Sequence, residues 1–524
     1  MDKSSLYNIK EGDLGRIVSE GLKKNFEDIL DDVNNKLSKD NTQEYTPTAD
    51  YNPATKKYVD NSITNATKNL QQKGDYVTED ALAQTLEDYA SNASVDEKLQ
   101  ELDIDSLAMY GVEFDKAVSS PDGTRIGNMT LHKTLPIHSL MRGCLLNDDG
   151  EVNKYLNPSD WTGETRDGSQ GQVMVEVPDH WWKFVTEGTK FRPQLYIVPV
   201  SGAIYVPKYY IGANEASLQR STSKLCSVVN TSEDYRGGNN NTEWDGTYRS
   251  LLGLPATNIL RTNFRTYARN RKEGSTAWNI CTYDIQKDLF WLFAVEYATL
   301  NTQKAYNATK TAEGYAQGGL GDGFTTLDWT KWTNYNGNNP VVPCGYTDSL
   351  GNGTGQIEFT MPTEYDSAIK IVSVPRYRGV ENPFGHIWQW TDGINVRISP
   401  DTESGGDGLS KVFVCSDPSK FNDSNYDGYS YVGNEARTEA YVKEIIFGEG
   451  GEIMPSVVGG SSTTYFCDYH YTNIPSAETL MGVLFGGGAA SGAYAGFACA
   501  ASNNAPSHSD AYFGSRLCFI PEKA

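Results

Sequence analysis

The segment 377–393, which reads YRGVENPFGHIWQWTDG, constrains the fold more than any other part of the chain. Trp388 and Trp390 are two residues apart, so in a β-strand both side chains lie on one face of the sheet. Pro383 and Gly385 come just before them and favour a turn. Two tryptophans on one face bury a large apolar area. The segment therefore predicts a turn followed by a strand at the centre of a hydrophobic core.

The composition narrows the class of protein. The 524 residues are enough for several domains, and the 50 glycines and 32 tyrosines favour a turn-rich β or mixed fold with many surface tyrosines. A surface of that kind suits adhesion. The net charge of −22 argues against binding to phosphates, which requires basic patches. We therefore expect no nucleic-acid partner.

The cysteines and the first residues bear on where the chain is assembled. Eight cysteines are scattered without a Cys-x-x-Cys pair, which favours free, buried thiols in a reducing cytosol over a zinc site or a disulfide framework. Residues 1–20 contain no apolar segment like that of a secretory signal, and no stretch is long enough to span a membrane. We expect no membrane insertion and no export by the general secretory route.

Residues 1–45 are the first predicted unit. Apolar residues recur three or four apart along one face of a charged helix, at Leu22, Phe26, Ile29, Val33 and Leu37. Such a stripe must be buried against other copies of the chain or against another protein. We expect this unit to be a helical anchor, with 1–20 as its docking peptide.

Residues 46–104 contain shorter helices of the same pattern. Their apolar seams lie at 59–70, 82–89 and 95–102. Isolated helices shorter than about 12–15 residues are marginal in water, so these segments need partners. Parallel self-association as a segmented α-helical coiled coil would stabilise them.

From about residue 104 the pattern changes to short apolar runs separated by Gly, Pro and Asn, which indicates strands and turns. We expect a β-rich connecting region at 105–200, with a hairpin over 173–185, that opens a head domain at 201–524. The apolar face of 284–299 predicts the clearest helix of this part. Later strands are predicted at 356–361, 368–374, 411–415 and 441–447.

The central segment resembles a known family. Its NPFGHIWQW sequence is similar to the Asn-Pro-x-Gly-x-Ile/Val-Trp-Glu-Trp element at the centre of the sulfatase-modifying-factor branch of the C-type lectin fold, and 457–462 and 514–519 resemble later strands of that family. The resemblance implies an α+β C-type-lectin-like domain with extra β elements, as in diversity-generating variable proteins. The fold-defining positions would be Asn382, Pro383, Gly385, Trp388, Trp390, Gly459, Gly460 and Arg516.

The NPATKKYVD sequence at 52–60 resembles a motif of phage fibre proteins, including head fibres, which are commonly trimers. It implies a homotrimeric virion fibre, assembled in the host cytoplasm, in which 1–45 binds capsid or tail proteins and 46–104 is the stalk. The C-terminal domain would then contact a host cell-surface glycan or protein. Attachment to the capsid is favoured over a tail fibre, and a purely decorative capsid protein is the remaining structural alternative.

An enzyme is the competing interpretation, because formylglycine-generating enzymes share the implied architecture and hold copper with two cysteines five residues apart. Here those positions fall near Thr464 and Tyr469, and Cys467 stands alone, so it cannot supply a site with two thiolates. A glycan-cleaving tailspike would show long β-helix repeats, which this sequence lacks. We expect a protein that is not an enzyme and that needs no cofactor or metal.

A calcium site is a second alternative. Asp423, Asn425, Asp427 and Gly428 match the opening of a calcium loop, but Asn434 stands at the twelfth position, where Glu is usual. Asx-rich turns have the same composition, and we favour that interpretation.

The terminal part of the chain, 456–524, is rich in Gly, Asn and Tyr, which make adaptable contacts on a rigid frame. In phage adhesins of the resembled fold the matching region is the ligand-binding face, so the resemblance places receptor-binding residues here. His470 is interpreted as a surface histidine of this region and not as a catalytic partner of Cys467. The candidates are Tyr465, Asp468, Tyr469, His470, Tyr471, Asn473, Tyr494, Asn503, Asn504, His508, Asp510 and Tyr512.

Overall fold

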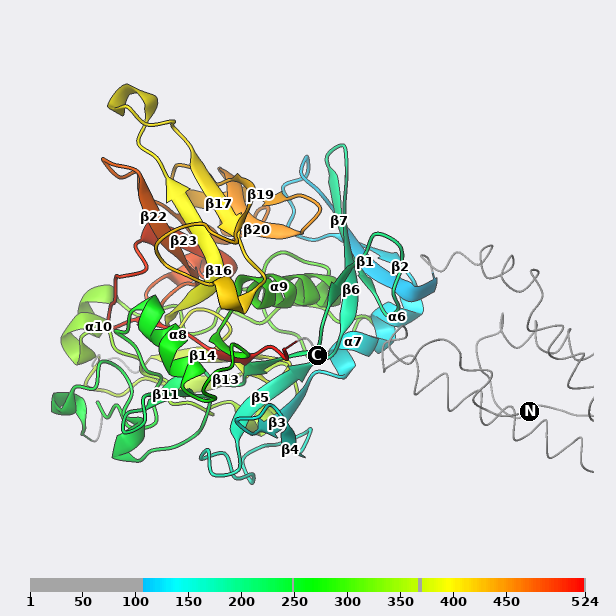
Figure 1. Cartoon of the computed structure of the whole chain (residues 1–524). Helices are drawn as coiled ribbons and strands as arrows, with labels where there is room; N and C mark the ends of the chain where they lie inside the picture. The colour runs from blue at the N-terminus through cyan, green and yellow to red at the C-terminus, as the bar shows by residue number, and fades with distance from the viewer. Residues whose placement is uncertain (1–106, 247–248, 366–369, 523–524) are drawn as a thin grey trace, which may run out of the picture. The chain divides into compact units, whose positions relative to one another are not determined.

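The computed structural model describes residues 107–246, 249–365 and 370–522. The predicted anchor (1–45) and stalk (46–104) lie outside the described residues. Residues 108–524 cluster as one unit, in which strands predominate and helices are few (Figure 1). The predicted connecting region, 105–200, shares sheets with the residues that follow it, as described below.

The largest sheet is built around β16 (Trp388–Ile398), the strand that carries the two tryptophans. Its strands lie in the order β18-β17-β16-β22-β23-β21-β19-β20, and β24 pairs with β16 in parallel. The edge strand β18 also contacts β19 and β20, so the sheet curls toward closure. The other bounds are β17 (Ser410–Val414), β18 (Ser430–Asn434), β19 (Ala440–Phe447), β20 (Glu452–Val458), β21 (Tyr469–Tyr471), β22 (Thr479–Gly486), β23 (Gly496–Asn504) and β24 (Phe513–Gly514).

The second sheet joins distant parts of the chain in the order β12-β25-β9-β5-β3-β4. Its strand β25 (Leu517–Phe519), close to the end of the chain, lies between β12 and β9. Strands from before and after residue 200 therefore share this sheet. The other bounds are β3 (Arg142–Leu146), β4 (Val152–Tyr155), β5 (Gln172–Val177), β9 (Tyr209–Gly212) and β12 (Trp278–Ile280).

The remaining strands form three smaller sheets. The five-stranded sheet has the order β2-β1-β7-β6-β8, with β1 (Met109–Asp115), β2 (Thr124–Gly127), β6 (His180–Glu187), β7 (Lys190–Tyr196) and β8 (Ile204–Val206). A three-stranded sheet contains β13 (Gly355–Thr360), β14 (Ile371–Tyr377) and β15 (Val380–Glu381), and β10 (Ser217–Gln219) pairs with β11 (Lys224–Cys226).

The predicted hairpin over 173–185 is wrong. Strand β5 pairs with β3 and β9, whereas β6 pairs with β7 and β8 in another sheet. All six residues of β5 are buried, as expected of a strand covered on both faces and flanked on both edges. The strands predicted near 356–361, 368–374, 411–415 and 441–447 are present as β13, β14, β17 and β19.

The predicted helix at 284–299 is confirmed as α9 (Tyr283–Tyr297), which lies between the sheets (Figure 1). The Thr282 side chain caps it by accepting a hydrogen bond from the Ile285 N–H, and nearly all of its residues are buried. Asp288 on this helix accepts hydrogen bonds from Trp182 Nε1 and the Tyr209 hydroxyl, both at 2.7 Å. The helix is thereby fixed to strands of two different sheets.

The other helices are short. They are α6 (Met129–Thr134), α7 (Pro136–Ser139), α8 (Arg261–Arg269) and α10 (Trp329–Asn336). Single 3₁₀ turns are η2 (Glu233–Tyr235), η3 (Thr242–Trp244), η4 (Asp348–Leu350), η5 (Thr402–Ser404), η6 (Pro418–Lys420) and η7 (Gly492–Tyr494). No helix among the described residues combines the length and apolarity needed to cross a membrane.

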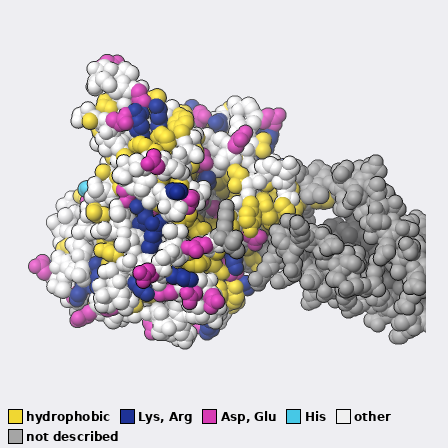
Figure 2. Space-filling model, viewed as in Figure 1, with side chains coloured by type: hydrophobic (Ala, Val, Ile, Leu, Met, Phe, Trp, Pro, Cys, Tyr) yellow, Lys and Arg dark blue, Asp and Glu magenta, His cyan; other side chains and the backbone are white. Residues whose placement is uncertain are grey.

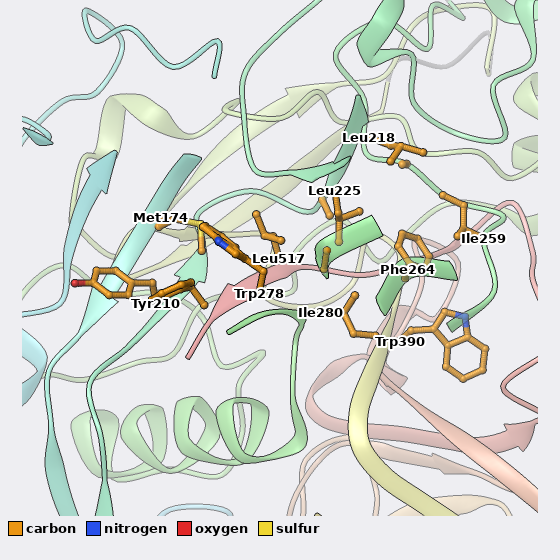
Figure 3. Close-up of a cluster of buried hydrophobic side chains, with 14 of the residues drawn as sticks. Met174, Tyr210, Leu218, Leu225, Ile259, Phe264, Trp278, Ile280, Trp390 and Leu517 are labelled. Carbon is orange, nitrogen blue, oxygen red and sulfur yellow. The ribbon is translucent and has the colours of Figure 1, made fainter. Parts of the chain in front are cut away.

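The prediction for the central segment is confirmed. Trp388 and Trp390 belong to the same hydrophobic cluster, together with Trp278, Phe264 and Leu517 (Figure 3). The turn before them is formed by 382–387, where Asn382 and Gly385 have positive φ angles of 45° and 88°. His386 in this turn accepts hydrogen bonds at Nε2 from the N–H groups of Val341 and Val342, and its Nδ1 donates to Glu215 at 2.6 Å. It is a structural histidine, as predicted.

Arg516 is a buried core residue, as predicted. Its buried guanidinium donates hydrogen bonds to the carbonyl oxygens of Gly212, Ala213, Glu381 and Asn382 at 2.6–3.2 Å. Gly459, in contrast, is exposed, and a Cβ there would meet no atom within 4 Å. It follows β20 with a φ of 123° and lies at the surface, so its assignment as a core position is wrong.

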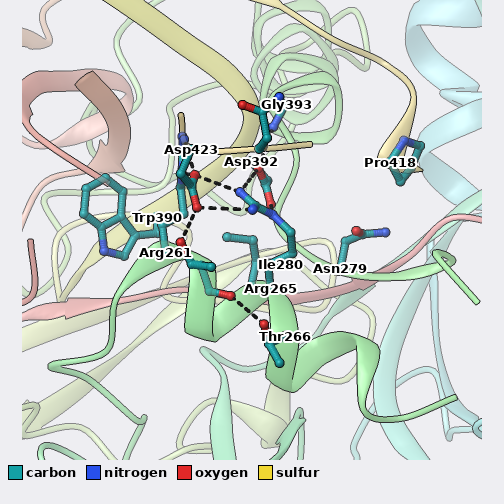
Figure 4. A network of polar contacts seen from close by, with 12 residues as sticks. Arg261, Arg265, Thr266, Asn279, Ile280, Trp390, Asp392, Gly393, Pro418 and Asp423 are labelled. Carbon is teal, nitrogen blue, oxygen red and sulfur yellow. Dashed lines mark hydrogen bonds and ion pairs between the residues drawn. The ribbon is translucent and has the colours of Figure 1, made fainter. Parts of the chain in front are cut away.

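A network of ion pairs fixes the segment 416–429 to α8 and β16 (Figure 4). Arg265 Nη2 lies 2.8 Å from Asp392 Oδ1 and 2.9 Å from Asp423 Oδ1, and Arg261 Nε donates to Asp423 at 2.7 Å. The Asp423 carboxylate is thus shared by two guanidinium groups. The Asn425 side chain accepts from the Asp427 N–H, which makes this segment an Asx turn, as favoured from the sequence.

The cysteines agree with the sequence prediction. All eight cysteines are buried and free. The face shown in Figure 2 carries acidic and basic side chains interspersed with uncharged surface. Some charged side chains of the domain are paired, such as Arg397 with Asp407 at 2.7 Å.

Candidate functional site: an aromatic pocket

A pocket of about 310 Å³ opens where β16, β21, β22 and β23 meet α10 and η7. Its volume is at the low end of the range of small-molecule sites, ~300–1,000 Å³. Its lining residues are Trp329, Trp332, Trp388, Tyr471, Leu484, Gly488, Ala490, Ser491, Tyr494, Ala501, Asn503, Asn504, Tyr512 and Phe513. None of these lining residues has a charged side chain.

One group of aromatic rings comes from α10 and Tyr512. Asp328 caps α10 by accepting from the Lys331 N–H, so Trp329 lies in the first turn. The Trp329 ring is edge-to-face with Tyr512, with centroids 5.3 Å apart, and 49% of the residue is exposed. Behind it, buried Trp332 donates from Nε1 to the Asn339 carbonyl at 2.8 Å. The hydrogen bond of Trp332 therefore fixes the buried side of this aromatic group.

A second group consists of tyrosines from β21 and η7. The rings of Tyr469 and Tyr494 have centroids 4.3 Å apart, and Tyr441 packs against both. Tyr471 lies edge-to-face on Trp388, with centroids 5.5 Å apart. Tyr494 is 40% exposed at the pocket, whereas Tyr441 and Tyr469 support it from outside the lining.

Gly488 lies between the two groups. A Cβ on this residue would be 3.3 Å from Trp388 Cδ1 and 3.8 Å from Tyr512 Cδ2. The absence of a side chain here therefore leaves the space between these rings open. Polar groups come from Ser491 and from Asn503 and Asn504, whose amides are joined by a hydrogen bond of 2.6 Å.

A second hollow of about 420 Å³ lies elsewhere and contains none of the predicted site residues. Its lining includes Glu243, Trp244, Arg249, Tyr335 and Glu364. The aromatic pocket is the better candidate site because residues predicted from the sequence to bind a receptor line it.

The pocket brings together five of the twelve predicted receptor-binding residues, namely Tyr471, Tyr494, Asn503, Asn504 and Tyr512. Tyr469 supports the pocket through its contact with Tyr494. The other four accessible candidates lie outside its lining: Tyr465, whose ring is 5.5 Å from Lys443 Nζ, exposed Asn473, and His508 with Asp510, whose Nε2 and Oδ2 are 3.9 Å apart.

Two of the predicted contact residues, Asp468 and His470, are buried, so their assignment to the binding face is wrong. Side chains alternate along β21, which places Tyr469 and Tyr471 on one face and His470 on the other. His470 Nε2 donates to the Ala436 carbonyl at 3.0 Å, and burial lowers the pKa of its imidazole to about 4. Asp468 accepts from the Ala498 N–H at 2.8 Å, and burial raises its pKa well above the usual value. The imidazole of His470 is therefore uncharged at neutral pH.

Sequence reasoning missed Trp329, Trp332 and Gly488 and assigned Trp388 to the core alone. The signal for α10 is readable: Asp328 is a good cap, and Trp329 and Trp332 are three residues apart on one helix face. Gly488 lies in a run of three glycines, and nothing in the sequence distinguishes it from its neighbours.

No protein-family model matches the sequence, and no curated protein matches it. Among solved structures, the chain is similar to PvdO from Pseudomonas aeruginosa, with 9% identity and a TM-score of 0.30 over 68% of this chain and 97% of that chain. It is also similar to the Major Tropism Determinant U1 variant (12% identity, TM-score 0.23, 72% and 71% of the two chains) and M1 variant (12%, 0.24, 73% and 72%). Likenesses at these TM-scores and identities establish no function for this chain.

Proposed function

We propose that this chain is a structural component of a phage virion, a fibre that contacts the host cell surface through the aromatic pocket of its C-terminal, lectin-like domain. The observation that carries the proposal is the pair of exposed rings, Trp329 and Tyr494, at a preformed and uncharged pocket. Large exposed aromatic side chains grouped in a concavity are typical of binding sites, in which they bury much area with few rotatable bonds. Five side chains that the sequence marked as receptor-binding line the same pocket.

The proposal is of binding and not of catalysis. Burial raises the pKa of the Cys467 thiol to about 12, so this cysteine is a protonated thiol at neutral pH. A soft-metal site of the formylglycine-generating type requires thiolates. The pocket itself is lined by no Asp, Glu, Lys, His or Cys side chain.

The remainder of the proposal rests on the sequence. The apolar seams of 46–104 support a self-associated stalk, and the resemblance of 52–60 to phage fibre proteins makes the expected assembly a homotrimer. Residues 1–45 would attach the fibre to the particle, with the capsid favoured over the tail. Three pockets on one stalk would bind a dense cell surface with greater avidity than a single pocket.

Competition with the virion tests this function. The purified full-length chain should slow adsorption of particles to host cells in a dose-dependent way, and gold-labelled antibody should place the chain on the particle surface. A decorative capsid protein would be seen on the particle but would leave adsorption unchanged. Failure to detect the chain on particles would contradict the proposal.

A further inference from the structure

We propose that the ligand of the aromatic pocket is a neutral saccharide. The inference rests on the proposed function and specifies its ligand. It starts from the absence of charge: among the fourteen residues that line the pocket, none is Asp, Glu, Lys, Arg or His. An anionic sugar would leave its carboxylate or sulfate next to aromatic rings without a cation to pair with, and removing such a charge from water is costly.

The aromatic groups fit the shape of a sugar ring. A pyranose has C–H bonds on its faces and hydroxyl groups around its edge. Trp329 and Tyr494, each 40% or more exposed, offer ring surfaces to such C–H faces. The amides of Asn503 and Asn504 and the hydroxyl of Ser491 offer both donors and acceptors for hydroxyl groups.

The concavity favours a saccharide over a folded protein surface. Stable protein interfaces bury about 800 Å² on each partner, and a pocket of about 310 Å³ admits only a protruding group. The aromatic groups are also preformed, because Trp332 is held by the Asn339 carbonyl and Tyr471 lies in β21, hydrogen-bonded between β19 and β23. A preformed site loses little entropy on binding, which matters for weak ligands such as sugars.

A quaternary ammonium group is the other ligand that uncharged aromatic pockets take. A quaternary ammonium group neither donates nor accepts hydrogen bonds, whereas three polar side chains, those of Ser491, Asn503 and Asn504, lie in this lining. The saccharide is therefore the better fit, and free choline is included in the test as a competitor.

The experiment is retention of the labelled full-length chain on an array of neutral and acidic glycans. Two variants alter the pocket: Gly488→Val fills the space between Trp388 and Tyr512, and Trp329→Ala removes one ring. Gly488 does not have a left-handed φ, but an added Cβ would lie 3.3 Å from Trp388 Cδ1, so the Trp388 ring must shift by a few tenths of an ångström to admit Val. Trp329→Ala adds no atoms and tests the pocket without this shift. Tyr205→Ala is the matched control, an aromatic residue that is 52% exposed in the five-stranded sheet and absent from the lining.

We expect the wild-type chain and Tyr205→Ala to be retained on neutral glycans, both pocket variants to bind at least 10-fold more weakly, and choline to leave binding unchanged. Retention on acidic glycans alone, displacement by choline, or no retention on any glycan would overturn the inference. The same proteins are applied to host cells in parallel. If cell binding depends on the pocket but no neutral glycan is bound, only the saccharide assignment fails; if the pocket variants bind cells like the wild type, the proposed function fails as well.

Discussion

At the residue scale, Glu435 is a buried acid beneath the strands that carry the pocket. Its Oε1 accepts hydrogen bonds from the hydroxyls of Ser502, at 2.7 Å, and Thr472, at 3.3 Å. Its Oε2 has no hydrogen-bond partner among the described residues. Burial raises the pKa of the carboxyl group from 4.5 to about 8, so the folded protein keeps this acid neutral near pH 7.

This raised pKa predicts a dependence of stability on pH. Between pH 4.5 and about 8 the unfolded chain has lost a proton that the folded chain keeps, so the free energy of unfolding falls as the pH rises through this window. Glu435→Gln removes the titration, and we expect it to stabilise the protein at pH 8 by ~2 kcal/mol relative to the wild type. Thermal unfolding at pH 5 and pH 8 checks this. Parallel pH profiles for the two proteins would contradict it.

Arg516 shows what a single buried donor group contributes. Its guanidinium serves four carbonyl groups from two segments, and the ammonium of a lysine cannot reproduce that fork. We expect Arg516→Lys to lower the free energy of unfolding by ~3 kcal/mol, measured by urea titration. Arg397→Lys, which changes a half-buried arginine paired with Asp407, should cost less than ~1 kcal/mol. Equal losses in the two variants would contradict this role.

The individual residues also show how far sequence reasoning reaches. The spacing of Trp388 and Trp390 predicted a shared face, and the structure confirms it, because alternation along a strand is a local rule. Alternation along 469–471 puts His470 on the face opposite to Tyr469 and Tyr471, so it could not share a binding surface with them. The sequence prediction relied on composition alone and assigned all three to the surface, whereas His470 is buried. Gly488 lies next to Trp388 in the fold although the two are 100 residues apart in the chain. No local sequence pattern could reveal that it lies between Trp388 and Tyr512.

At the element scale, α8 and the segment 416–429 depend on one carboxylate. Asp423 is paired with Arg261 and Arg265, and although burial opposes ionisation, these guanidinium groups lower its pKa to about 2. The stability that Asp423 contributes is thus present above pH 3.8 and is lost as the pH falls through about 2.

Asp423→Asn should therefore destabilise the protein at neutral pH by ~3 kcal/mol, because two guanidinium groups lose their charged partner. The segment should also become open to trypsin at exposed Lys420. Asp427→Asn is the matched control, since Asp427 is exposed in the same segment. Limited proteolysis with thermal unfolding distinguishes the two variants, and equal cleavage would show that the network does not hold the segment.

Helices were predictable from the sequence where their apolar periodicity extended over several turns, whereas the pairing of strands was not. The helix α9 was found because its apolar residues continue over four turns, and α10 was missed because eight residues give a weaker period. The hairpin assigned to 173–185 failed because periodicity does not specify which strands pair.

At the scale of the whole molecule, the topology could not be predicted. Strand β25 pairs with β9 and β12, and its partners lie hundreds of residues earlier in the chain. The segment 105–200 was predicted to be a connecting region that opens the head domain at 201–524, and the structure joins the two through the pairing of β5 with β9. The helical seams at 1–104 remain a prediction, since they lie outside the described residues.

The stalk predicts the mass of the protein in solution. Helices as short as those expected at 46–104 need partners, and the resemblance to phage fibres makes the expected assembly a trimer. Light scattering of the full-length chain should give three times the 57.8 kDa of a single chain. The mass of one chain would remove the stalk from the proposed function.

The most direct measurement of the central claim is the adsorption rate of virions that carry Gly488→Val. These particles should contain as much of the chain as wild-type particles, because the substitution lies in the pocket and not in the anchor. We predict adsorption at least 10-fold slower than that of wild-type particles and of particles carrying Tyr205→Ala. Adsorption at the wild-type rate would contradict the claim that this aromatic pocket contacts the host.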